Sequence, residues 1–176
     1  EGATGRGGLA SHDGAGAGHQ FSKWMQSKHA RAYAALSTPE AKQIAIISGV
    51  PSEPQESALC LGCHATAAET ELWEREEGFR IEDGVQCEKC HGPGSEYADA
   101  QIMRNPEAAM RAGLRKIELR DCMVCHSEKG SHVAVHKLPK LDMTEAWKKI
   151  SHMRPDEPVL RQFPVPGGTG DDQDRS

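Results

Sequence analysis

Three short motifs contain all six cysteines of this chain and restrict what it can fold into. They are Cys60-Leu-Gly-Cys63-His64, Cys87-Glu-Lys-Cys90-His91 and Cys122-Met-Val-Cys125-His126, and each follows the pattern C-x-x-C-H. This pattern is the attachment signature of c-type haem, in which two thiols bond to the porphyrin and the histidine ligates the iron. The sequence therefore predicts three covalently attached haems c, with His64, His91 and His126 as proximal ligands.

Zinc binding and disulfide pairing are the competing interpretations of the same cysteines. Two C-x-x-C pairs can hold a zinc ion, and six cysteines can form three disulfides. Neither arrangement needs a histidine directly after every second cysteine, and neither needs the same spacing three times. Haem attachment accounts for both regularities, so we take it as the working interpretation.

The apolar content is thin for a chain that must build its own core. Hydrophobic residues make up 37% and aromatic residues 5% of the 176 residues, a length that suits one domain. Three porphyrins would replace part of the side-chain core, because each one is a large apolar plate. We therefore expect the haem-free polypeptide to be largely unfolded.

Charge and hydropathy limit the partners and the location. The formal net charge is −5, and haem propionates would make it more negative, which argues against nucleic acid and favours basic redox partner proteins. No apolar run approaches the roughly 18 residues that a transmembrane segment needs. Covalent haem attachment takes place outside the cytoplasm in bacteria, so we expect a removed signal peptide and a periplasmic or extracellular chain.

The chain divides into three parts by composition. Residues 1–18 are rich in Gly and Ala and are expected to be a flexible arm, and residues 161–176 a polar C-terminal tail. The haem-binding domain is expected between them, over residues 19–160. Self-assembly or membership of a larger redox complex is compatible with such terminal segments.

Helical patterns dominate the central part, and no convincing strand pattern occurs. Helices are predicted over 21–37, over 41–48 after Thr38-Pro39, over 65–77 before Gly78, over 106–113 after Asn105, and from 143 to about 152 after Asp142. Within 65–77, Glu69, Glu71, Glu74 and Glu76 are expected to form a solvated acidic face. The predicted fold class is mainly α, with short helices and long loops wrapped around three covalently attached haems.

Three segments resemble the multihaem cytochromes of the cytochrome c-554 type. They are Trp24-x-x-Ser27-x-His29-Ala30, the run from Gly84-Val85-Gln86-Cys87 to His91-Gly92-Pro93-Gly94-Ser95, and Trp147-Lys148-Lys149-Ile150-Ser151-His152. The resemblance implies a periplasmic electron carrier with closely packed haems, often with bis-histidine ligation. Such proteins usually carry one more C-x-x-C-H before the Trp24 segment, where this chain has Ala15-Gly16-Ala17-Gly18-His19 and therefore no thiols.

Six further histidines are candidates for the distal position on each iron. His29 is favoured because it lies on the apolar side of a predicted helix and matches the distal ligand that the resemblance implies. His152 matches the late segment of the same proteins. His132 and His136 are four residues apart and could share a helical face. His12 and His19 belong to the predicted arm, where His19 could also serve a non-covalent haem.

Electron transfer between redox partners is the function that these features favour, and no catalytic residue is predicted. One alternative is a subunit of a larger redox complex or a cytochrome filament, held by a histidine from a neighbouring subunit. The other is an enzyme acting on a nitrogen oxide or hydroxylamine at one open iron, for which the haem on Cys60 and Cys63 is the candidate.

Overall fold

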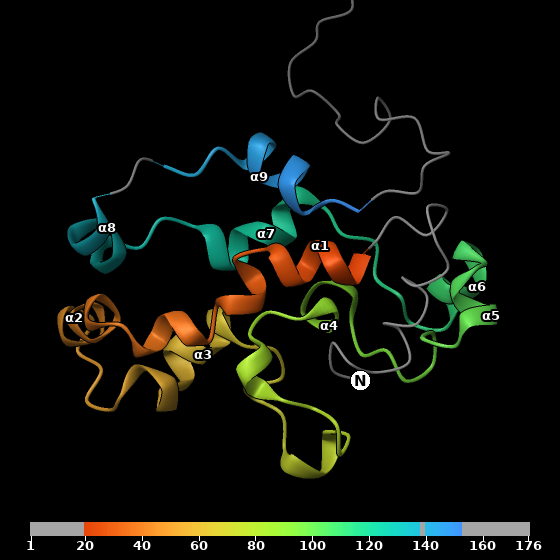
Figure 1. The fold of residues 1–176 in the computed structure, drawn as a ribbon, viewed down its shortest axis with the longest axis horizontal. Helices are drawn as coiled ribbons and strands as arrows, with labels where there is room; N and C mark the ends of the chain where they lie inside the picture. The colour runs from red at the N-terminus through yellow and green to blue at the C-terminus, as the bar shows by residue number, and fades with distance from the viewer. Residues whose placement is uncertain (1–19, 138–139, 153–176) are drawn as a thin grey trace, which may run out of the picture.

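Short helices and long loops make up the computed structural model, which describes residues 20–137 and 140–152 (Figure 1). None of these residues lies in a β-strand, so the prediction of a mainly α protein is confirmed for the described part. None of its helices is long and apolar enough to cross a membrane. The predicted arm (1–18), the predicted tail (161–176), His12 and His19 lie outside the described residues.

The described residues form α-helices and 3-10 helices. The α-helices are α1 (Gln20–Gln26), α2 (Pro39–Ile47), α3 (Ala58–His64), α4 (Cys87–His91), α5 (Ala100–Met103), α6 (Pro106–Arg111), α7 (Leu119–His126), α8 (Gly130–His136) and α9 (Met143–Ile150). The 3-10 helices are η3 (His29–Arg31), η4 (Ala34–Ser37), η5 (Pro54–Glu56), η6 (Leu72–Glu74) and η7 (Ile81–Asp83).

The chain forms two segments that face each other. In Figure 1, α7, α8 and α9 lie along one side of the molecule, and α2, α3 and α4 lie opposite them. We call residues 20–111 the N-terminal segment and the described residues of 119–152 the C-terminal segment. Contacts between α2 and α8 join the two segments at one end.

All buried residues of the described part belong to the N-terminal segment. A small cluster of Leu36, Leu61 and Ala65 lies at its centre, next to Tyr33 and Ile81. The other buried hydrophobic residues are Ile44, Ala45, Val85, Tyr97, Ala98 and Ala109. No residue of 110–137 or 140–152 is buried. The C-terminal segment therefore has no protein core of its own.

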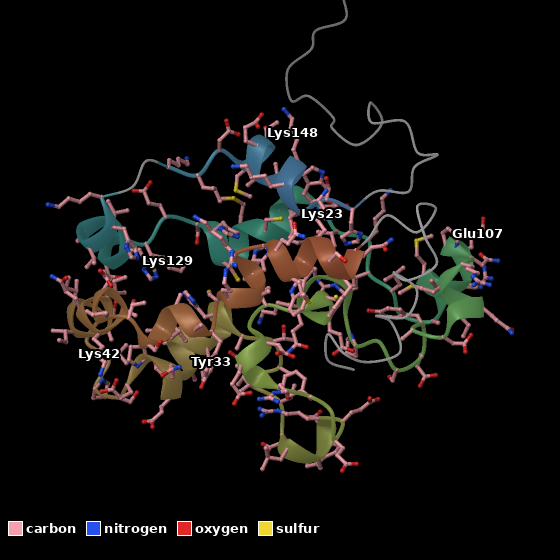
Figure 2. All side chains as sticks on the ribbon, viewed as in Figure 1. Lys23, Tyr33, Lys42, Glu107, Lys129 and Lys148 are labelled. Atoms are coloured by element: carbon pink, nitrogen blue, oxygen red, sulfur yellow. The ribbon has the colours of Figure 1, made fainter. Side chains whose placement is uncertain are left out.

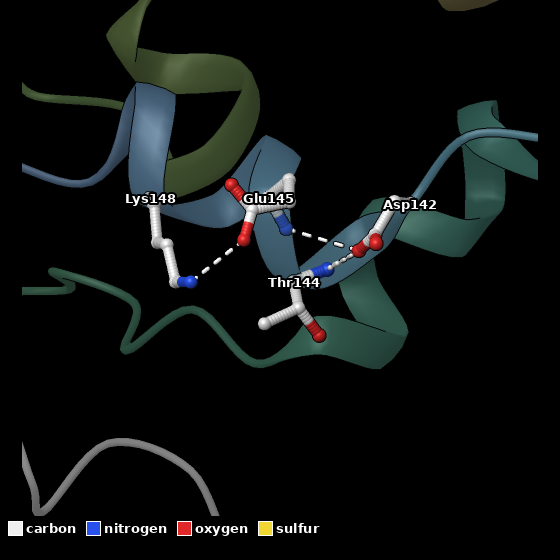
Figure 3. A network of polar contacts seen from close by, with 4 residues as sticks. All are labelled: Asp142, Thr144, Glu145 and Lys148. Atoms are coloured by element: carbon white, nitrogen blue, oxygen red, sulfur yellow. Dashed lines mark hydrogen bonds and ion pairs between the residues drawn. The ribbon is translucent and has the colours of Figure 1, made fainter.

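Three predicted helix starts are confirmed by their capping contacts. The Thr38 hydroxyl accepts a hydrogen bond from the Ala41 amide at 3.2 Å at the start of α2, and Asn105 accepts one from Ala108 at 3.1 Å before α6. At α9, Asp142 accepts bonds from the amides of Thr144 and Glu145 at 2.9 and 3.0 Å (Figure 3). Glu145 pairs with Lys148 at 2.7 Å, so its side chain is held by that lysine on the helix surface.

The continuous helix predicted over 21–37 is wrong, because the backbone is broken near His29. The helix α1 ends at Gln26, and the Ser27 hydroxyl then accepts a hydrogen bond from the His29 amide at 3.2 Å. The His29 carbonyl accepts from the Val85 amide at 3.0 Å, a bond to a distant part of the chain. Two 3-10 turns, η3 and η4, replace the rest of the predicted helix.

The helix predicted over 65–77 is also wrong, and only the short turn η6 forms there. The Thr66 amide donates to the Gly84 carbonyl at 2.9 Å, and Ala67 has φ +52°. The φ angle of Ala67 is that of the left-handed conformation, and a right-handed helix cannot continue through such a residue. The chain leaves α3 as a loop that closes on itself, and the acidic residues in it are carried on that loop.

Candidate haem attachment and ligation sites

Each C-x-x-C-H motif forms the end of a short helix. They close α3 at His64, α4 at His91 and α7 at His126. Positions three and four apart share one face of a helix, so the two thiols and the histidine of each motif project to the same side. All six thiols are free and are exposed or half-buried. Each motif therefore presents two thiols and one imidazole to a single neighbouring group.

The cysteines of the described residues are not arranged for the two competing interpretations. No disulfide joins any of the six thiols. Within residues 20–137 and 140–152, no three side chains of His, Cys, Asp or Glu meet as a metal site would require. A structural zinc ion needs four such ligands at tetrahedral positions.

A second histidine faces each motif histidine. The ring centroids are 6.4 Å apart for His64 and His132, 5.7 Å for His91 and His152, and 5.9 Å for His126 and His29. We call these the three histidine pairs. Each of them joins one residue of the N-terminal segment to one of the C-terminal segment.

The spacing of these pairs fits an iron between two imidazoles. A metal–nitrogen bond is about 2 Å long, and the centre of an imidazole lies about 1 Å behind its nitrogen. Two rings on opposite sides of one iron therefore have centroids roughly 6 Å apart. The observed 5.7 to 6.4 Å matches this value.

Backbone carbonyls orient two of the motif histidines. Nδ1 of His64 lies 2.9 Å from the Ala32 carbonyl, and Nδ1 of His91 lies 3.2 Å from the Arg115 carbonyl. A carbonyl can only accept, so each Nδ1 carries the proton and each Nε2 keeps its lone pair. This is the tautomer in which Nε2 can ligate a metal.

Partial burial favours the neutral form of the ligand candidates. It lowers the pKa of His29 and His152, and the facing histidine lowers each pKa further. It also lowers the pKa of His132, where His64 and His136 add to the shift. The pKa values of His91 and His126 are lowered mainly by burial too. Only a neutral imidazole can ligate iron, so these environments favour the ligating form.

The motifs lie next to one another in the order first, third, second. Burial raises the pKa of the Cys125 thiol to about 11, and the neighbouring thiol of Cys63 adds to the rise. Burial likewise raises the pKa of Cys90, with the thiol of Cys122 as the next contribution. The third motif thus borders the first through one of its cysteines and the second through the other.

The segment before the second motif also holds His29 in place. Gly84 has φ +72°, and a Cβ atom there would lie 2.6 Å from the His29 carbonyl oxygen. Val85 donates to that oxygen and accepts a hydrogen bond from the Trp24 indole at 2.7 Å. Only glycine allows this approach. The run of Gly84 and Val85 therefore positions a residue of the third histidine pair.

The segment that directly follows the second motif is held in place by hydrogen bonds. The Glu88 carboxylate accepts a hydrogen bond from the Gly94 amide at 2.7 Å, and the Tyr97 hydroxyl donates to the Gly92 carbonyl at 2.5 Å. Burial raises the pKa of Tyr97 to about 12, so its hydroxyl remains a donor. The Arg115 amide donates to the His91 carbonyl at 2.9 Å and holds this motif against the following chain.

The predicted distal histidines separate into three groups. His29, His152 and His132 each face a motif histidine, whereas the ring of His136 faces His132 at 6.3 Å. His12 and His19 lie outside the described residues. The sequence did not indicate which histidine faces which motif, or that the carbonyls of Ala32 and Arg115 orient two of them. Such contacts join residues far apart in the chain and leave no local pattern.

Free thiol pairs followed by histidine, with each histidine facing a second one, are the arrangement expected of a c-type cytochrome. The comparison with known families agrees: the family described as cytochrome c554 and c-prime matches residues 12–92. Residues 12–92 are thus similar to cytochrome c554, and this similarity supports a c-type cytochrome. The matched range includes the first two motifs and His29 and ends before the third. No curated protein and no solved structure matches the chain.

Proposed function

We propose that this protein is a trihaem electron carrier in which all three irons have two histidine ligands. The observation that carries the proposal is the set of three histidine pairs, each with ring centroids 5.7 to 6.4 Å apart. The proximal ligands are His64, His91 and His126. Their distal partners are His132, His152 and His29 in the same order.

Full ligation favours electron transfer over small-molecule catalysis. An enzyme acting on a nitrogen oxide or hydroxylamine needs one iron with an open position. The first motif was the candidate for such a site, and His132 faces His64 there. A filled sixth position leaves no place for a substrate on the metal, and an electron carrier needs none.

The chain's residues would hold haem and set its environment. When bound, the haem iron supplies one-electron oxidation and reduction. The cysteines would anchor the porphyrin, the paired imidazoles would ligate its iron, and the carbonyls of Ala32 and Arg115 would fix the orientation of two of these imidazoles. Imidazoles held in place in this way would stay on the iron in both oxidation states and would keep the reorganisation on electron transfer small.

The placement of the attachment sites suits a carrier that holds several electrons close together. The third motif adjoins the first through Cys125 and Cys63, and it adjoins the second through Cys122 and Cys90. Haems held on these adjoining motifs would be neighbours. The partners would be redox proteins, and the location would be the periplasm or the extracellular space, as covalent haem attachment requires.

Electron paramagnetic resonance of the oxidised holoprotein tests the proposal directly. We expect only low-spin ferric signals, because imidazoles on both sides of the iron give a strong ligand field. A pyridine haemochrome assay on the same sample should give three haems per chain. A high-spin signal from the purified protein would contradict complete ligation and would support the enzyme alternative.

Removing the thiols of one motif at a time tests covalent attachment. Each double Cys→Ala variant should lower the mass of the denatured chain by one haem, because thioether bonds survive denaturation and axial bonds do not. The three variants are Cys60→Ala with Cys63→Ala, Cys87→Ala with Cys90→Ala, and Cys122→Ala with Cys125→Ala. An unchanged mass for any of them would remove that motif from the attachment sites.

A further inference from the structure

A projecting loop presents two large apolar side chains to solvent. The acidic loop, as we call residues 66–84, leads from the first motif to the second and extends away from α7, α8 and α9 in Figure 1. At its η6 turn, Leu72 is 80% exposed and Trp73 is 82% exposed. Isolated exposed leucines are common, but an adjacent Trp with this exposure is a typical anchor for a protein partner.

Internal contacts give the acidic loop a defined structure. At its base, the Thr66 hydroxyl accepts a hydrogen bond from the Gln86 amide at 2.8 Å. Inside it, the Arg75 guanidinium donates to the hydroxyl and carbonyl of Thr70 at 3.1 and 2.9 Å and lies 5.6 Å from the Phe79 ring centroid. The Glu71 amide donates to the Glu74 carboxylate at 2.8 Å and closes the η6 turn. The exposed pair is therefore held at the tip by a folded turn.

The charge of the acidic loop is strongly one-sided. It carries seven acidic residues and two basic ones, a net charge of −5. One of the two cations, Arg75, is directed inward to Thr70 and Phe79. Glu76 and Glu77, three and four residues after Trp73, are exposed. An apolar tip surrounded by carboxylates is complementary to an apolar pocket with a basic rim.

The base of the acidic loop lies next to the first haem motif. The Glu69 carboxylate reaches to 3.7 Å from the position of a Cβ atom on Gly62, which lies between Cys60 and Cys63. The histidine pairs lie between the two segments, whereas the loop extends to the other side. A protein bound at the tip would thus sit near the first attachment site without displacing a histidine of the pairs.

We propose that the acidic loop is a docking surface for a cationic redox protein, which receives Leu72 and Trp73 in an apolar pocket with a lysine- or arginine-rich rim. The inference rests on the proposed electron-transfer function and specifies the class of partner. A second copy of this chain is a poorer match, because two chains of net charge −5 repel each other at long range. Charge steering would speed the encounter, and the apolar pair would hold the complex.

Binding of the holoprotein to a lysine-rich monohaem cytochrome c tests the inference by titration calorimetry at low ionic strength. The double variant Leu72→Ala with Trp73→Ala should weaken binding about tenfold, as loss of an interface anchor does. Its matched control is Ile46→Ala with Ile47→Ala, two exposed residues of α2 that are 76% and 51% exposed. Glu77→Lys should weaken binding several-fold, and its matched control is Glu107→Lys on α6 (Figure 2). Both controls should stay within about twofold of the unmodified protein.

Three results would overturn the inference. The first is that the tip variants bind as tightly as their controls. The second is that an acidic flavodoxin binds as tightly as the basic cytochrome. The third is that the chain self-associates in sedimentation experiments and that the double variant of Leu72 and Trp73 abolishes this self-association. Reduction of the holoprotein by dithionite, followed by its absorbance, reports the proposed function separately. If the holoprotein is reduced normally and the tip variant binds as tightly as the unmodified protein, the docking surface is contradicted and the proposed electron-transfer function is not.

Discussion

Preparation of this chain without haem should leave the C-terminal segment unfolded. The physical reason is the distribution of buried residues: no residue of 110–137 or 140–152 is buried, and α7 and α8 expose Leu119, Val124 and Val133 among others. The histidine pairs hold this segment to the rest only when a metal joins their rings. Short helices of seven or eight residues are not stable in water by themselves.

Hydrogen exchange followed by mass spectrometry measures this effect segment by segment. Amides of α7, α8 and α9 should lose about a thousandfold in protection when haem is absent, on the order of 4 kcal/mol. The cluster of Leu36, Leu61 and Ala65 provides an internal comparison, because it packs against protein and should keep more residual protection. Equal, native-like protection in the haem-free chain would mean that the polypeptide alone specifies the fold.

The fold could be predicted from sequence wherever local signals determine it. Thr38, Asn105 and Asp142 each cap the helix predicted to follow them, because a capping side chain acts within three residues of itself. The three motifs also indicated attachment sites without reference to the rest of the chain. Both kinds of signal involve residues only a few positions apart in the chain, so they can be read from a single sequence.

The two wrong helices show where local signals fail. Residues 21–37 have helical spacing of their apolar side chains, but the His29 carbonyl is bonded by Val85 and the helix stops before it. Residues 65–77 are rich in helix formers, but Thr66 is bonded to Gly84. In each case the competing partner comes from residues 84–85. A tertiary contact with the segment before the second motif overrides helix propensity at both places.

The distal histidines show the same limit at the site. From the sequence, His29 and His152 were the favoured distal ligands, and the choice between His132 and His136 was open. In the structure, the ring of His132 rather than that of His136 lies opposite the motif histidine His64. The rings of His64 and His132 are inclined by only 27°, whereas His136 faces His132. The choice depends on how α8 sits against α2, which is a contact between distant parts of the chain.

Replacing His132 by alanine should open one iron of three in the holoprotein. The imidazole that faces His64 would be lost, and the ferric iron at the first site would turn from low-spin to high-spin. Electron paramagnetic resonance should then show a high-spin signal from about one third of the iron. Added imidazole should restore the low-spin signal, because the free base can occupy the space that the side chain left.

His136→Ala is the matched control, since it removes the same side chain one helical turn away. It should leave the spectrum unchanged, because the His136 ring contacts His132 and no motif histidine in the described residues. If His136→Ala gives the high-spin signal and His132→Ala does not, the helix α8 sits one turn differently and the assigned pair is wrong. If neither does, the sixth ligand of the first site comes from outside residues 130–136.

The His132→Ala variant also distinguishes an electron carrier from an enzyme. Turnover of hydroxylamine that appears only in this variant would mean that His132 keeps the native iron closed to substrates.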